Sequence, residues 1–297
     1  MSSAGDVELA RRAPVRNAGP VTAPPAPHVE RLTRADLHAC VELARSCGWR
    51  DELSDWRPLF AAAEVRGVRW GDELVATCSR AAYGTVAVLG KLLVRGEARR
   101  RGLARALMEA SIAASDGAVV TLVATEAGRP LYESLGFAPV GEVVVLEGRL
   151  VRDGPPLPGG VTLGAFDLAR AIELDRRITS CDRAEALRAR AAEAVHAWCA
   201  FRGAELVGYV MATSRPDRRV IGPVITLEPS LGAALVHAVA GMHDVRVDVP
   251  SFHWSLVESL TARGLAVAAR RAELTLGGVA LPLSAPGRVA LAAQALG

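Results

Sequence analysis

The sequence predicts an α/β protein whose sheets are mixed (α+β), built from two tandem copies of one fold. Strand-like and helix-like segments alternate along the chain, and the order of elements before a Pro/Gly-rich segment at 153–160 returns after it. A repeated order of elements indicates a repeated fold rather than one large sheet. The length of 297 residues also suits two domains of ~100–200 residues each.

The chain divides into five segments by composition. Residues 1–27 are rich in Pro and Ala without periodicity, and we expect a disordered tail. The first globular half spans 28–152, and the linker spans 153–160. The second half spans 161–280, and 281–297 form a C-terminal extension.

The first half predicts the order β-α-α-β-β-β-α-β-α-β. Thr33 is a suitable N-cap for the first helix, and Gly136 is a suitable stop for the last one. Expected strands are 29–33, 64–70, 73–81, 86–94 and 119–123. Expected helices are 34–46, 51–62, 102–115 and 129–135. The segment 86–94 is apolar almost throughout, which is typical of a central strand covered on both faces.

The sequence of the second half predicts a similar succession of strands and helices. Expected strands are 161–163, 197–202, 205–212, 220–225, 245–249 and 267–276. Expected helices are 167–176, 183–194, 231–240 and 252–263. The likeness between the halves rests on this order of elements, because their sequences have little in common.

Composition excludes several classes of protein. Hydrophobic residues make up 51% and charged residues 23%, which is a globular balance. The net charge of +3 is too small and too dispersed to indicate nucleic-acid binding. We expect no membrane span, no export signal and a cytoplasmic protein. Five separate cysteines without a CxxC pair predict neither a metal site nor a disulfide framework.

The chemically informative segment follows the strand 86–94. The chain continues through Arg99-Arg100-Arg101 into Gly102, where a helix is expected to begin. The first amides of a helix lack partners within the helix and bind anions such as a diphosphate. Gly102 and the small Ala104 let a phosphate approach closely, and the arginines add positive charge.

Arg99-x-x-Gly102-x-Ala104 resembles the R/Q-x-x-G-x-G/A signature of GCN5-related N-acetyltransferases (GNAT). Its place after a buried strand and at a helix start strengthens the resemblance. A second segment, 128–137, is similar to the family's A-x-x-L-Y-E-x-x-G-F segment and includes Tyr132. The tryptophan-containing segment 48–56 also looks like the start of many bacterial GNAT domains, so the resemblance covers about 28–150.

The resemblance implies an acetyl-CoA-dependent N-acetyltransferase. The backbone of Leu93 and Val94 would bind pantetheine and polarise the acetyl carbonyl, and Tyr132 would act as the general acid. A helix residue packed on the sheet is the alternative for Tyr132. The diphosphate would be held by the loop residues Arg99, Arg100, Arg101, Gly102, Leu103, Ala104 and Arg105.

The general base is left open by the sequence. Many family members carry a Glu on the strand before the phosphate loop, but 86–94 contains no carboxylate. Glu52, Asp55 or a chain of water molecules remain possible. Lys91 on that strand is expected to face solvent.

The second half resembles, more weakly, the C-terminal half of bacterial two-domain GNAT proteins. It lacks the phosphate signature after 220–225, and Glu228 would repel a phosphate, so we expect no CoA binding there. Asp182, Asp248 and His253 are candidate substrate-binding groups of a cleft that this half would complete. A helix cap, a turn residue and a packed histidine are the respective alternatives.

The sequence therefore favours an enzyme that acetylates a primary amine of a small molecule or a protein, with no metal ion. The alternative is a non-catalytic acyl-CoA-binding regulatory module. The acceptor amine and the oligomeric state are left open, because a shared fold does not identify a substrate.

Overall fold

The structure is a computed structural model that describes residues 27–151 and 153–297. The predicted tail therefore lies outside the described residues, apart from Pro27. Strands and helices alternate in a mixed α/β arrangement, which confirms the predicted fold class. Among the described helices, none is long and apolar enough to cross a membrane.

The first half follows the predicted order closely. Its strands are β1 (Glu30–Arg31), β2 (Glu64–Trp70), β3 (Glu73–Ala82), β4 (Val86–Val94), β5 (Val119–Val123) and β6 (Phe137–Arg149). Its helices are α1 (Leu37–Ser46), α2 (Leu53–Ala62), α3 (Leu103–Ala113) and α4 (Arg129–Ser134). A short 3₁₀ turn precedes α1, where the Asp36 carboxylate accepts hydrogen bonds from the amide and hydroxyl of Thr33. Gly136, with a φ of +89°, ends α4 as expected.

The second half begins with β7 and ends with β13. Its strands are β7 (Val161–Ala165), β8 (Ala194–Arg202), β9 (Glu205–Ser214), β10 (Arg219–Thr226), β11 (Asp244–Pro250), β12 (Leu265–Leu276) and β13 (Arg288–Ala290). Its helices are α5 (Leu168–Thr179), α6 (Ala184–Glu193), α7 (Gly232–Ala240) and α8 (Trp254–Thr261). The side chain of Asp167 caps α5 by accepting from the Arg170 amide at 3.1 Å.

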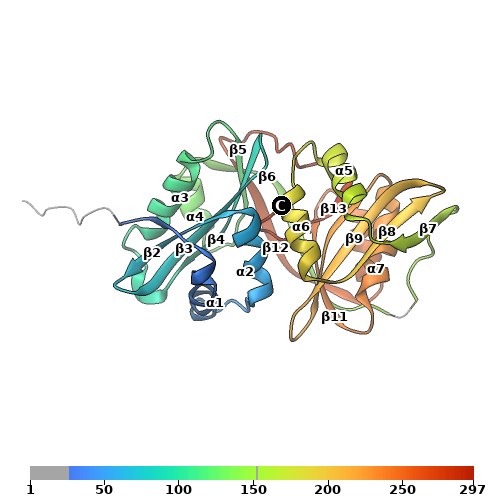
Figure 1. The fold of residues 1–297 in the computed structure, drawn as a ribbon, viewed down its shortest axis with the longest axis horizontal. Helices are drawn as coiled ribbons and strands as arrows, with labels where there is room; N and C mark the ends of the chain where they lie inside the picture. Colours follow the sequence, from blue (N-terminus) through green and yellow to red (C-terminus); the bar gives the residue numbers. More distant parts are fainter. Residues whose placement is uncertain (1–26, 152) are drawn as a thin grey trace, which may run out of the picture.

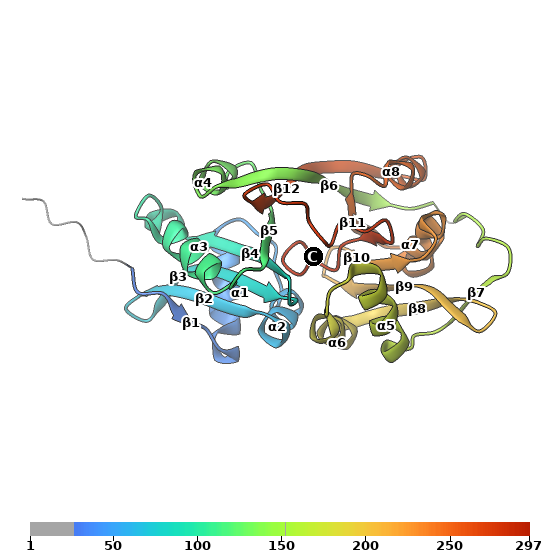
Figure 2. The ribbon, with the colours of Figure 1, turned by 90° about the horizontal axis from the view of Figure 1, so that it is seen from above.

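The two halves exchange strands and share one sheet of 13 strands. Strand β12, from the second half, pairs with β5 of the first half, and β6, from the first half, pairs with β11 of the second. β6 and β12 also pair with each other and run across both halves (Figure 2). The predicted division into 28–152 and 161–280 separates the sequence, but each half completes its part of the sheet with a strand of the other.

Helices cover both faces of the sheet in each half (Figure 1). In the first half, α1 and α2 share a core with residues such as Trp56 and Leu43, whereas α3 and α4 share another with Leu107 and Tyr132. In the second half, α7 and α8 pack on one face, and α5 packs on the other against Tyr209. The sheet is therefore buried along its centre, where β4 and β5 carry the first candidate site.

The C-terminal extension lies between the two halves (Figures 1 and 2). The Leu296 carbonyl accepts a hydrogen bond from Tyr83 of the first half at 2.9 Å. The Gly297 carbonyl accepts one from Arg183 of the second half at 2.6 Å. Ala295 approaches β4 so closely that a Cβ added at Gly90 would lie 2.4 Å from the Cβ of Ala295. The extension thus forms hydrogen bonds with both halves and contributes to the wall of the cavity described below.

Candidate functional site

Strands β4 and β5 separate at the point where the cofactor is expected to lie. These parallel strands pair only from Val86 to Leu89 on β4, and a bulge follows at Lys91, whose φ is +48°. Arg95 donates to the Val75 carbonyl, so by the alternation of an antiparallel pair Val94 faces the gap and Leu93 faces β3. Of the two predicted backbone ligands, only Val94 therefore directs its polar groups away from β3. Its carbonyl already accepts hydrogen bonds from Arg99 Nε at 3.2 Å and from Cys47 Sγ at 3.4 Å.

The turn into α3 carries a set of amides that the protein leaves open. Gly102 is the N-cap with a φ of +77°, a left-handed conformation that favours glycine. Within the described chain, no amide from Arg100 to Arg105 donates to a protein acceptor. The buried side chain of Leu103 fixes the helix start, and Ala104 adds little bulk. These amides, together with the helix dipole, form an anion site of the predicted kind.

The arginines of the turn surround these amides. Arg99 Nε donates to the Val94 carbonyl at 3.2 Å, which links the turn to the end of β4. Arg101 lies over the Trp70 ring at 4.9 Å, and Arg105 Nη2 donates to Ser134 Oγ on α4 at 2.7 Å. The side chains of Arg99, Arg100 and Arg101 are exposed, so their charge is available to a ligand at the helix start.

Tyr132 lies beneath the gap on α4. It is 8% exposed, packs edge-on against Phe137 and lines the cavity. A Cβ at Gly128 would lie 2.8 Å from its ring, so the glycine allows the ring to occupy this place. Burial raises the pKa of the phenol well above its ordinary value. Tyr132 therefore stays protonated to a higher pH than a free tyrosine.

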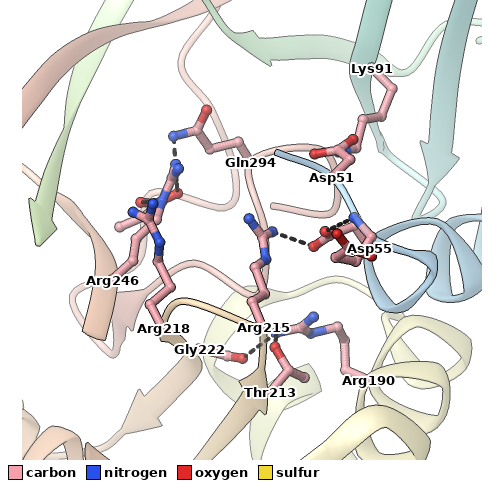
Figure 3. Close-up of polar contacts among 12 residues, drawn as sticks. Asp51, Asp55, Lys91, Arg190, Thr213, Arg215, Arg218, Gly222, Arg246 and Gln294 are labelled. Atoms are coloured by element: carbon pink, nitrogen blue, oxygen red, sulfur yellow. Dashed lines mark hydrogen bonds and ion pairs between the residues drawn. The ribbon is translucent and has the colours of Figure 1, made fainter. Parts of the chain in front are cut away.

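A cavity of about 560 Å³ extends from this gap to the second half. Sites for small molecules commonly have volumes of ~300–1,000 Å³. The first half contributes Trp49, Asp51, Asp55, Lys91 and Tyr132 to its lining. The second half contributes Arg190, Arg215, Arg218, Arg246 and Asp248, and the extension contributes Ala293, Gln294, Ala295 and Leu296. Neither half encloses the cavity alone (Figure 3).

Ion pairs organise the cavity wall. Lys91 was expected to face solvent, but that prediction is wrong: its side chain is 10% exposed and its Nζ lies 2.5 Å from Asp51. The bulge in β4 turns the lysine inward, where its ammonium also lies over the rings of Trp49 and Trp56. Asp55 pairs with Arg215 and so joins the two halves (Figure 3).

Of the two carboxylates considered as bases, the structure brings only one to the cavity. Asp55, in the first turn of α2, lines the cavity. Glu52 instead accepts hydrogen bonds from Arg45 at 3.0 and 3.1 Å at the surface, and it does not line the cavity. Both residues lie in the tryptophan-containing segment, so their position in the sequence could not show which one reaches the cavity. Their side chains leave the start of α2 in different directions.

The three predicted substrate residues lie apart. Asp248 lines the cavity, is 7% exposed and accepts hydrogen bonds from Arg246 and Gln294. Asp182 is exposed, pairs with Arg176 at 3.0 Å and lies outside the cavity. His253 is buried, and its Nε2 lies 3.1 Å from the Arg288 carbonyl of β13. Of the three, only Asp248 is in a position to meet a ligand there.

The stability of the protein should fall between pH 7.5 and pH 5. Burial lowers the pKa of His196, His237 and His253 below the ordinary value of 6.5. The unfolded chain then takes up protons first, so this contribution is present above pH 6.5 and is lost as the pH falls through the folded pKa values. Urea midpoints at the two pH values measure the loss, which His253→Asn should reduce. Replacing the exposed His38 by Asn is the control, and an equal loss in both variants would contradict the assignment.

The equivalent gap of the second half is filled by the chain itself. Strand β13 pairs with β10 at Val224 and Ile225, and the Leu291 amide donates to the Asp248 carbonyl of β11 at 3.0 Å. The bulged Gly222 lies so near that an added Cβ would be 1.9 Å from the Leu291 oxygen. These contacts give a steric reason, beyond the absent signature, for the expectation that this half binds no CoA.

The sequence did not identify the arginines of the cavity. Arg190, Arg215, Arg218, Arg246 and Arg271 come from helices, strands and loops spread over 82 positions, and no two of them share a recognisable motif. Only the fold of the second half brings them together. Within the described residues, no three His, Cys, Asp or Glu side chains lie together as a metal site would require.

Comparisons with known proteins agree with this geometry. One acetyltransferase (GNAT) domain model matches residues 44–139, and a second matches residues 171–285. YitH of Bacillus subtilis, described as an uncharacterized N-acetyltransferase, is 25% identical over 261 residues, which are 79% of this chain and 86% of the relative.

Solved structures share the fold. A Pyrococcus horikoshii protein assigned as an acetyltransferase aligns with a TM-score of 0.76 and 16% identity, over 95% of this chain and all of that one. A tandem GNAT protein of the clavulanic acid pathway aligns with a TM-score of 0.59 and 18% identity, over 84% of this chain and 97% of that one. The two domain matches together span more than half of the chain, which belongs to the GNAT acetyltransferase family and contains two GNAT domains in tandem.

Proposed function

We propose that the chain transfers an acetyl group from acetyl-CoA to a primary amine of a small molecule or a protein. The observation that carries the proposal is the set of open amides at the start of α3. The turn that bears them follows β4, and the bulged part of β4 lines the cavity together with Tyr132. The diphosphate would lie on the amides from Arg100 to Arg105, and the pantetheine would extend along Val94.

The reaction requires three proton movements. The nitrogen lone pair attacks the thioester carbon, an N–C bond forms, and the C–S bond breaks with its electron pair leaving on sulfur. The ammonium must first lose a proton, to solvent or to a cavity carboxylate such as Asp55. The leaving thiolate takes a proton, which we assign to the phenol of Tyr132, a buried residue of the cavity lining. The nitrogen loses its second proton as the amide forms, and that proton returns to the Tyr132 phenolate directly or through water.

We propose different roles for the two halves. Residues 28–152 would bind the acetyl donor, and residues 161–280 would close the acceptor side of the cavity with Arg215, Arg246 and Asp248. The gap between β10 and β11 in the second half is occupied by β13 and the residue after it, which supports this division. Room for a donor molecule is then left in the first half alone.

Release of free CoA thiol in the presence of a panel of amines tests the proposal. We expect thiol release that depends on an amine, together with an acetylated product found by mass spectrometry. If the protein binds acetyl-CoA but releases no CoA thiol in the presence of any amine, the result would instead favour the non-catalytic acyl-CoA-binding module.

Tyr132→Phe should lower kcat while leaving acetyl-CoA affinity nearly unchanged. The phenol is assigned only to the leaving sulfur, so its loss should reduce turnover about 100-fold, within the ~10²–10⁴-fold range of general acid catalysis. The same thiol assay gives kcat, and calorimetry gives the affinity. Phe137→Leu, which alters the packing of the ring but keeps the phenol, is the control. Unaltered turnover in Tyr132→Phe would reject the acid role.

A further inference from the structure

The cavity as a whole contains more basic than acidic side chains. Its lining includes seven basic side chains and four carboxylates. Each carboxylate already has a cationic partner: Lys91 holds Asp51, and Arg215 holds Asp55. On the opposite wall, Arg218 lies 2.5 Å from Glu147, and Arg246 lies 2.9 Å from Asp248. Excess positive charge therefore remains after every carboxylate of the lining is paired.

Arg190 on α6 is the most buried of the cations without a carboxylate partner. It is 3% exposed, and its hydrogen-bond partners are neutral: Nη2 lies 3.1 Å from the Gly222 carbonyl and 3.4 Å from the Thr213 hydroxyl (Figure 3). Its Nε has no hydrogen-bond partner within the described residues. Burial lowers the pKa of Arg190 to about 10, so the group is still a cation at neutral pH.

Arg271 on β12 is a second such cation. It is half-buried, and no carboxylate of the described chain lies within 4.0 Å of it. Burial, and then the charge of Arg246, lowers the pKa of its guanidinium. Arg271 thus adds positive charge to a wall that already holds like charge.

Buried arginines elsewhere in this protein are paired. Arg183 donates to Asp175 at 2.7 Å, and Arg288 lies 3.2 Å from Glu273. A buried charge without a counter-charge is strongly destabilising, so proteins rarely keep one without a use for it. Arg190 and Arg271 depart from the rule followed by Arg183 and Arg288, and both face the cavity of the reaction.

We propose that the acceptor amine also carries an anionic group, a carboxylate or a phosphate, which binds Arg190 and Arg271. This inference rests on the proposed acetyl transfer. Guanidinium groups match the planar geometry of carboxylate and phosphate oxygens. The amine end would then point toward β4 and Tyr132, on the wall that carries Asp51 and Asp55.

Matched ligand pairs test the inference by calorimetry on the complex of the protein with CoA. L-lysine against L-lysinamide tests a carboxylate, and glucosamine 6-phosphate against glucosamine tests a phosphate. In at least one pair, the anionic member should bind about 10- to 100-fold more tightly, as expected for hydrogen bonds to charged groups. No preference for the anionic member in either pair would overturn the inference.

Arg271→Gln should abolish that preference, and Arg270→Gln is the matched control. Arg270 is the next residue of β12, but it pairs with Glu142 and stacks on Trp254 outside the cavity. Arg190→Gln is a second variant, used if circular dichroism shows that it folds. A preference that persists in Arg271→Gln would overturn the role of this residue.

The outcomes separate this inference from the proposed function. Preference for the anion without thiol release from acetyl-CoA would leave the anion site standing and reject acetyl transfer. Thiol release with uncharged amines and no preference for anions would leave acetyl transfer standing and reject the anion site.

Discussion

Gly102→Glu is expected to abolish the binding of acetyl-CoA. The new carboxylate would lie beside the open amides of α3, where the diphosphate is proposed to sit, and would repel it. The substitution would also place a residue with a Cβ at a φ of +77°, a conformation that strains the backbone and disturbs the start of the helix. We expect at least about a 100-fold loss of affinity by calorimetry, comparable to losing two charge-assisted hydrogen bonds.

Gly84→Glu is the matched control for this prediction. Gly84 has a φ of +76°, and an added Cβ would meet no atom within 4 Å, as at Gly102. It lies in the turn between β3 and β4, at the opposite end of β4 from the phosphate turn. The control should suffer the same backbone strain and keep its affinity. Unchanged affinity in Gly102→Glu, or an equal loss in both variants, would refute the assignment of the turn.

Local signals allowed the first half to be predicted well. The apolar segment 86–94 and the short run 119–123 became β4 and β5 with those bounds. The helix after Gly102 was expected from residue 102 and begins at Leu103, because a glycine in a left-handed conformation can end one element and start the next. The bounds of these strands and of this helix depend on residues that are close in sequence, so the residue pattern is enough to predict them.

The strand exchange could not be predicted in the same way. Periodicity indicates which face of a strand is buried, but it does not indicate which strand lies beside it. The segment 267–276 was expected as a strand of the second half, and it is one by sequence, yet it pairs with β5 of the first half. The short β13 in the extension was missed, because three residues are too few to show a period.

The cavity was the part of the site least accessible from the sequence. Lys91 was assigned to solvent from strict alternation along β4, but the bulge breaks the alternation at that residue and turns it inward. Nothing in the sequence of α6 distinguishes Arg190 from the exposed Arg188 of the same helix. Only the packing of α6 against the first half and β10 makes it a buried residue of the cavity.

Asp175→Ala should cause the largest loss of stability. Asp175 is 1% exposed on α5 and accepts hydrogen bonds from Arg183 at 2.7 and 3.0 Å and from the Tyr209 hydroxyl at 2.6 Å. Removing the carboxylate leaves the Arg183 guanidinium buried without a counter-charge and the tyrosine without its acceptor. We expect the free energy of unfolding to fall by about 3–5 kcal/mol, measured by urea denaturation at neutral pH.

Glu185→Ala measures what an exposed pair contributes in the same region. Glu185 lies on α6, and its partner Arg188 is 2.6 Å away, but both side chains are more than half exposed. Solvent screening should keep that loss below about 1 kcal/mol. Because Arg183 also donates to the Gly297 carbonyl, Asp175→Ala should further loosen the extension that joins the two halves. A loss in Asp175→Ala no larger than that of Glu185→Ala would mean that the buried ion pair stabilises the protein no more than an exposed one.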